Sequence, residues 1–170
     1  LCAPDAANST DRLDAELTLW REEERPLRSG TSVHVHLGAC DVMATVAVLD
    51  APNGTHSLIP GETGRVQLVL HKPVGAWHGD RVVLRDASAS RTMAGGRVLS
   101  TDAPVRYRRT PQRIAMLDAW SLPTPEARLA GLLAASPTGI DLTLWSRAEG
   151  RSGGVPGAAE CPDGTLFGQD

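Results

Sequence analysis

The feature that most constrains this chain is a period-two alternation of apolar residues that recurs between positions 12 and 86. Apolar residues stand at every second position from Leu13 to Leu19, and segments 32–38 and 65–71 repeat the pattern. Successive side chains of a strand point to opposite faces of a sheet, so the alternation predicts half-buried strands. Turn signals rich in Gly, Pro and Asn separate the segments.

Two further segments, 41–50 and 81–86, are strand-like but apolar on both faces. This pattern predicts strands that are central or covered on both sides. About six strands at short spacing, with no helical pattern between them, indicate an antiparallel barrel or sandwich. Because closure removes exposed sheet edges, we predict a mainly β fold, a closed six-stranded antiparallel barrel.

The pattern changes after residue 103, where a basic, Pro-punctuated linker at 104–112 leads into helical signals at 113–150. Thr124 before Pro125 predicts a helix start, Asp141 predicts a second N-cap, and Gly150 predicts a helix stop. Three short helices are typical of a winged-helix-like segment. The domain organisation that we predict is the end of a preceding domain at 1–10, a barrel at 11–103, the linker at 104–112, helices at 113–150 and an irregular tail at 151–170.

The composition of the chain argues against several classes of function but does not identify one. The formal net charge of −3 gives no general attraction to nucleic acid, so any such role must be local. The three cysteines, Cys2, Cys40 and Cys161, have no disulfide or zinc-knuckle spacing, which favours a reducing cytoplasm. No apolar run reaches membrane-spanning length, so no membrane partner is predicted. The opening residues, without Met, favour an excised fragment.

Catalytic motifs are missing. There is no G-x-x-x-x-G-K-[ST] phosphate loop and no G-x-S-x-G, so we predict no catalytic residue and no cofactor in this chain. The pair His34 and His36 is the one metal-like spacing, since alternate residues share a strand face. Without an assigned third ligand, we predict no metal and place both histidines on a half-exposed strand. A small β-barrel metalloenzyme that uses this pair is the alternative.

Arginines form two groups. Arg85 and Arg91 flank a small polar loop at 86–90, where they either bind an anion or close a hairpin by pairing with carboxylates such as Asp80, Asp86 or Glu62. The second group is a possible RNA-binding linker, in which Tyr107 is interleaved: Arg106, Arg108, Arg109 and Arg113.

The order of the segments resembles a known family. The chain reads "LRSGTSVHVHLGACDVMATVAVLD", then "LIPGETGRVQLVLHKPVGAWHGDRVVLRD", then "SRTMAGGRVL". This succession resembles the third domain of the elongation factor Tu family of translational GTPases: a P-G-[DE] turn, a strand ending in K-P-[VIL], a G-x-R-[FV]-x-[IL]-R strand and R-T-x-[AG]-x-G. Within that family it is most similar to the selenocysteine-specific elongation factors (SelB). The resemblance covers about residues 1–120, and more loosely extends to 150.

The resemblance implies a cytoplasmic, non-catalytic barrel that binds the T-stem side of selenocysteyl-tRNA and packs on a GTPase domain. GTP and Mg²⁺ would belong to that other domain, and the ribosome and selenoprotein mRNA would be partners of the full-length protein. A second alternative is a barrel that only docks the GTPase domain.

The tRNA-binding residues implied are Lys72, Arg85, Asp86, Ala87, Ser88 and His34. Met43 departs from the family, where a small polar residue follows D-V, and the loop at 87–90 is longer than the family's Gly-Gly. Arg91 adds charge, and the small loop residues would let backbone N–H groups and the Ser88 hydroxyl reach phosphate or ribose. Gly95 and Gly96 would allow tight packing or a bulge in the last strand.

Overall fold

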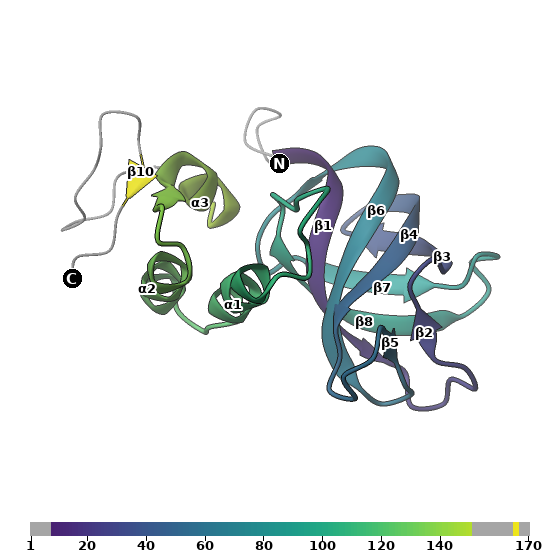
Figure 1. The fold of residues 1–170 in the computed structure, drawn as a ribbon. Coiled ribbons are helices and arrows are strands. Elements are labelled where there is room, and N and C mark those ends of the chain that lie inside the picture. Colours follow the sequence, from purple (N-terminus) through teal and green to yellow (C-terminus); the bar gives the residue numbers. More distant parts are fainter. Residues whose placement is uncertain (1–7, 151–164, 167–170) are drawn as a thin grey trace.

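The chain folds into a β-barrel with helices beside it, as the computed structural model in Figure 1 shows. The structure describes residues 8–150 and 165–166. Six antiparallel strands close the barrel in the order β1-β6-β4-β3-β7-β8. Their bounds are β1 (Asn8–Leu19), β3 (Ser32–Leu37), β4 (Cys40–Asp50), β6 (Thr63–Ala76), β7 (Arg81–Arg85) and β8 (Thr92–Ser100). The predicted closed six-stranded barrel is confirmed.

Two short strand pairs lie outside the barrel. β2 (Leu27–Arg28) pairs with β5 (Ser57–Leu58), and β9 (Ile140–Asp141) pairs with β10 (Thr165–Leu166). The predicted end of a preceding domain lies mostly outside the described residues, and so does most of the predicted irregular tail.

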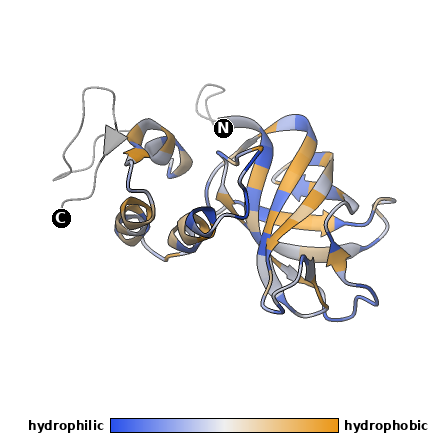
Figure 2. Ribbon diagram, viewed as in Figure 1, coloured by the Kyte–Doolittle hydropathy of each residue, from blue (hydrophilic) through white to orange (hydrophobic). Residues whose placement is uncertain are grey.

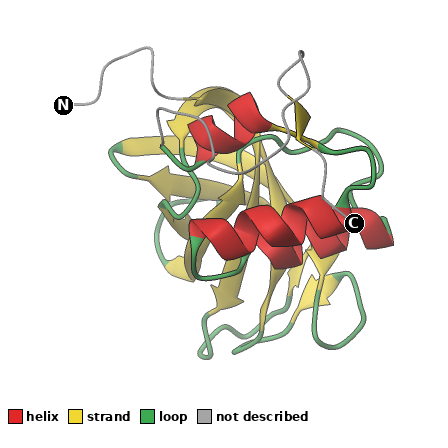
Figure 3. Cartoon of the chain, turned by 90° about the vertical axis from the view of Figure 1, so that its left-hand side faces the viewer, coloured by secondary structure: helices red, strands yellow, loops and turns green. Residues whose placement is uncertain are grey.

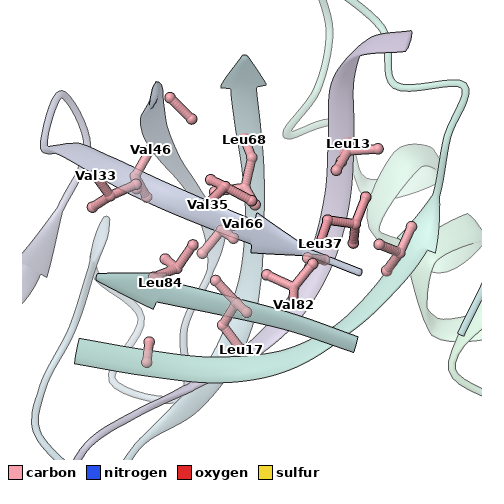
Figure 4. Packing of buried hydrophobic residues seen from close by; sticks show 14 of the residues in the cluster. Leu13, Leu17, Val33, Val35, Leu37, Val46, Val66, Leu68, Val82 and Leu84 are labelled. Carbon is pink, nitrogen blue, oxygen red and sulfur yellow. The ribbon is translucent and has the colours of Figure 1, made fainter. Parts of the chain in front are cut away.

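The barrel interior is filled by the alternating apolar residues (Figure 4). Leu13, Leu17, Val33, Val35 and Leu68 are all completely buried. Hydrophobic and hydrophilic positions alternate along the barrel strands (Figure 2), as a sheet with one buried face requires.

Segments 41–50 and 81–86 were predicted to be central or covered on both sides, and β4 and β7 each lie between two strands of the barrel. Val83 on the outer face of β7 is 37 % exposed, so this face of β7 is open to solvent. In β4 the outer residue Leu49 is 4 % exposed and packs in the helical cluster described below.

The last strand closes against the first at very short range. A Cβ atom placed on Gly96 would lie 1.9 Å from the carbonyl oxygen of Glu16 on β1. Only glycine permits this approach, so the predicted tight packing holds at Gly96.

Three helices occur in the described residues and lie on one side of the barrel (Figures 1 and 3). They are α1 (Pro111–Trp120), α2 (Pro125–Ala135) and α3 (Leu142–Ala148). The predicted N-caps are confirmed: the Thr124 side chain accepts a hydrogen bond from the Ala127 amide, and Asp141 accepts from Thr143 and Leu144. No helix in this part of the chain is long and apolar enough to cross a membrane.

The helices share an apolar cluster with the outside of the barrel. Leu99 of β8 projects outward into it and meets Leu117, Trp120 and Trp145, all at most 7 % exposed. The His78 ring lies against Trp120, with ring centroids 5.0 Å apart, and its Nδ1–H donates to the Leu99 carbonyl oxygen at 2.9 Å.

Polar contacts fasten the same surface, which we call the barrel–helix joint. Arg113 of α1 forms an ion pair with Asp14 of β1, and the two residues are 8 % and 0 % exposed. Gln67 of β6 donates to Asp14 at 3.2 Å. Arg97 donates to the Ser121 carbonyl oxygen at 3.1 Å, and Asp118 pairs with Arg65.

Candidate nucleic-acid interface

The outer surface of β7 and β3 carries the predicted site. Arg85 lies directly opposite His34, and Val83 lies opposite His36. Residues opposite one another in a sheet share a face, so these side chains form one outward patch together with Arg81. We call this patch, Arg81, Val83, Arg85, His34 and His36, the β7 face.

Two side chains of the β7 face have a shielded nitrogen without a hydrogen-bond partner: His36, at Nε2, and Arg85. The Nε–H of Arg85 is shielded from solvent and has no hydrogen-bond partner. An unsatisfied buried donor costs free energy, and the cost is larger for a charged group. The residue as a whole is only partly buried, so its guanidinium remains reachable for an external acceptor.

The two histidines of the β7 face turn toward Asp41 on β4. His34 Nδ1 lies 2.9 Å from Asp41 Oδ1, and His36 Nε2 lies 3.8 Å from the same oxygen. The hydrogen bond from His34 holds the pKa of Asp41 below its ordinary value. Within residues 8–150, no group of three or more His, Cys, Asp or Glu side chains is arranged to hold a metal ion. The metalloenzyme alternative therefore gains no support.

The loop after β7 is organised around Asp86. Its carboxylate accepts hydrogen bonds from the amides of Ser90 and Arg91, at 2.7 and 2.9 Å, and from the hydroxyl of Ser88 at 2.6 Å. These bonds, with the Ser88 bond contributing most, lower the pKa of Asp86. Ala89 adopts a left-handed conformation with φ 53°. The loop is therefore a closed turn held by an aspartate, as Asp side chains commonly form.

This turn corrects one expectation. The Ser88 hydroxyl and the amides near it were expected to reach a ligand, but the hydroxyl and two of those amides serve Asp86 instead. Ala87 and Ser88 are exposed, so the loop remains thin at its tip. An Asp followed by small polar residues was the signal that could have shown this arrangement in advance.

Arg91 forms an ion pair with Glu23, although its own side chain is 54 % exposed. Its Nη1 lies 2.9 Å from Glu23 Oε1, and the Glu23 side chain is 3 % exposed. Glu23 lies after β1 and outside the β7–β8 hairpin, so this pair is not the hairpin-closing pairing with Asp80, Asp86 or Glu62 that was the alternative. The structure does not place Lys72 beside Arg85: Lys72 is exposed on β6, and β4 and β3 separate it from β7.

Most of the linker arginines also face the barrel. Arg108 donates to Gln67 at 3.0 Å, Arg109 donates to the Val48 carbonyl oxygen at 2.9 Å, and Arg113 is buried against Asp14. Arg106 is exposed. The hypothesis of an RNA-binding linker fails for Arg113, because its guanidinium lies inside the joint.

The fold defines the first part of the chain as a small closed β-barrel module with an outward cationic strand. Residues 14–105 match the family model described as "Selenocysteine-specific elongation factor, beta-barrel domain". The match covers more than half of the chain, and the chain belongs to this family.

Three curated relatives carry the name "Selenocysteine-specific elongation factor". The protein of Desulfomicrobium baculatum is 34 % identical over 87 residues, which are 51 % of this chain and 13 % of that protein. The Haemophilus influenzae protein is 25 % identical over 138 residues, 81 % of this chain and 21 % of that protein. The Escherichia coli protein is 33 % identical over 92 residues, which are 54 % of this chain and 13 % of that protein. The chain therefore spans a small part of the length of these relatives.

Proposed function

We propose that this chain binds the T-stem side of selenocysteyl-tRNA through the β7 face, as part of a selenocysteine-specific elongation factor. The observation that carries the proposal is Arg85, a partly exposed cation on an outward strand face whose guanidinium has no hydrogen-bond partner within the described residues. A phosphate oxygen is the acceptor that suits a guanidinium best, since the two can form paired, charge-assisted hydrogen bonds.

The proposed mode of binding is backbone contact. Arg85 meets phosphate, His34 lies beside it on the neighbouring strand, and the thin loop at Ala87 and Ser88 lets the RNA come close. Lys72 adds a second, separate phosphate contact from β6. Such contacts position an RNA and carry no base identity, so selection of the tRNA would come from its shape or from other parts of the protein.

The second part of the proposal is that the barrel packs on a GTPase domain that binds GTP and Mg²⁺. Two large apolar side chains support it: Trp20 is 57 % exposed and Ile59 is 48 % exposed. Trp20 lies in the loop after β1, and Ile59 lies in the loop before β6. Backbone hydrogen bonds of Leu19 with Glu62 and Gly61 hold these two loops side by side. Exposed apolar groups that gather in one place mark interaction sites.

In this proposal the chain itself performs no chemistry, and its helical residues 113–150 begin a winged-helix region. The full-length protein would act in the cytoplasm, with the ribosome and selenoprotein mRNA as partners.

A barrel that only docks the GTPase domain is the competing function. It is favoured by the ion pair of Arg91 with Glu23 and by the bonds of Arg108, Arg109 and Arg113 to acceptors on the barrel. These pairs leave fewer cations available for RNA than the sequence offers.

Salt-dependent binding of the 170-residue chain to a labelled selenocysteine tRNA transcript, with an elongator tRNA in parallel, tests the proposal. For each phosphate contact removed, the slope of log affinity against log salt should flatten by about 0.7 to 0.9. We expect this for Arg85→Ala and for Lys72→Ala. The matched control is Arg28→Ala, an exposed arginine on β2, which pairs with β5 outside the barrel. Absence of binding, or slopes that neither variant changes in folded protein, would favour the docking function.

A further inference from the structure

A groove lies on the outer barrel surface where β1, β7 and β8 run side by side. It has a volume of about 530 Å³, and its lining includes Arg81 and Val83 of β7, Gly95 and Arg97 of β8, and Glu16 of β1. The groove shares Arg81 and Val83 with the β7 face, so the two are continuous.

Two like charges stand side by side in the lining of this groove. Arg81 and Arg97 are directly opposite in the pairing of β7 with β8. Like charges in this arrangement destabilise a sheet unless something compensates them. Arg97 is compensated by Glu16, whose Oε1 lies 3.2 Å from its Nη2. Arg81 is exposed and makes no side-chain ion pair or hydrogen bond within the described residues, so one positive charge of the groove is left for an external anion.

Gly95 keeps the groove open. A Cβ atom placed on it would meet only the Val82 carbonyl oxygen, at 3.8 Å, which is an ordinary contact. Its φ angle is not in the left-handed region. The protein interior therefore does not require glycine here, in contrast to Gly96. Glycine weakens a strand interior, and where it stands without internal need it often marks close approach by another backbone.

We propose that this groove binds the sugar–phosphate backbone of RNA and extends the contact surface from Arg85 to Arg81; the proposal rests on the function proposed above. Arg81, Val83 and Arg85 are alternate residues of one strand and point to the same side. At a rise of about 3.3 Å per residue, Arg81 and Arg85 stand roughly 13 Å apart along the strand, so a backbone that contacts both passes over several phosphates. RNA, and not a protein segment, suits a groove with an unpaired positive charge, a glycine floor and only Val82 and Val83 as apolar lining side chains.

Two substitutions separate charge from space. Arg81→Gln removes the cation and keeps the length of the side chain. Gly95→Val fills the groove with a residue that favours strands, at a position where a Cβ atom meets only the Val82 carbonyl oxygen, at 3.8 Å. Arg28→Gln on β2 is the matched control for loss of an exposed arginine, and circular dichroism with thermal unfolding verifies that each variant is folded.

Fluorescence anisotropy with a labelled selenocysteine tRNA transcript, at salt concentrations from 50 to 200 mM, measures the effect. Arg81→Gln should weaken binding at low salt and flatten the salt slope by about 0.8, so that its deficit shrinks about threefold across this fourfold range of salt. Gly95→Val should weaken binding by a similar factor at every salt concentration, since it blocks approach and removes no charge.

The outcomes distinguish this inference from the function on which it rests. If Arg85→Ala weakens binding while Arg81→Gln and Gly95→Val match the control, the groove is not part of the RNA surface and the inference is overturned, although the proposed function stands. If the wild-type chain does not bind the transcript, or Arg85→Ala and Lys72→Ala have no effect, both fail together. Loss of affinity in both groove variants, with a flatter slope only for Arg81→Gln, supports the inference.

Discussion

Replacing Asp14 by leucine removes one partner of the buried ion pair in the barrel–helix joint. Asp14 is 0 % exposed and Arg113 is 8 % exposed, so the guanidinium that remains cannot turn to solvent. Its other acceptors are the Ser100 hydroxyl at 3.4 Å and the Asp102 carbonyl oxygen at 3.3 Å, both long. Breaking a buried pair in this way costs about 3–5 kcal/mol.

Urea unfolding measures this loss. With an m-value of about 2 kcal/mol per molar urea, the midpoint should fall by about 1.5–2.5 M. Amide exchange should locate the damage, with protection lost first in α1 and its neighbours, since Arg113 belongs to α1.

Two further variants make the test specific. The double variant Asp14→Leu with Arg113→Met replaces both charges by apolar groups and should recover most of the lost stability. Asp118→Ala removes a carboxylate that is 57 % exposed from the ion pair with Arg65, and it should cost less than about 1 kcal/mol. The reasoning is refuted if Asp14→Leu costs no more than Asp118→Ala, or if the double variant is as unstable as the two single losses added together.

Three other predictions follow from single side chains. Burial lowers the pKa of His78, so the folded state binds the proton of His78 less tightly than the unfolded state does. The free energy of unfolding should therefore fall as the pH drops below about 6.5. In urea titrations, His78→Phe should remove that part of the pH dependence. Asp86→Ala should speed amide exchange at Ser90 and Arg91 while the barrel amides stay protected, since Asp86 accepts both hydrogen bonds; unchanged exchange would show that the turn holds without its carboxylate. Ser88→Trp should thicken the exposed loop tip and weaken binding of a tRNA transcript with little change in the salt slope, and an unaltered affinity would place the RNA elsewhere.

The sequence predicted those features whose causes are local. The alternation around Leu13 and Leu17 specifies which side of β1 is buried, because the period of a strand leaves no other choice. Thr124 and Asp141 begin helices because their side chains satisfy the first free amides, a contact only two or three residues long. Val83 shows the limit of this reasoning: an apolar residue in a strand does not reveal whether another element covers it.

The site depended on contacts that no local pattern contains. Arg91 pairs with Glu23, which is 68 residues away in the sequence, and Arg113 pairs with Asp14, which is 99 residues away in the sequence. A run of arginines therefore looked like one basic surface, although Arg108, Arg109 and Arg113 have separate acceptors on the barrel. The shielded Nε of Arg85 was equally invisible, since it results from how β7 lies beside its neighbours.

The polar character of the barrel–helix joint has a mechanical consequence. Two apolar surfaces can slide or rotate over one another at small cost, whereas the Asp14–Arg113 pair with its Gln67 hydrogen bond is satisfied in one alignment only. The helices are thus held at one azimuth around the barrel axis. A small rotation of the barrel therefore turns the three helices with it, as one lever.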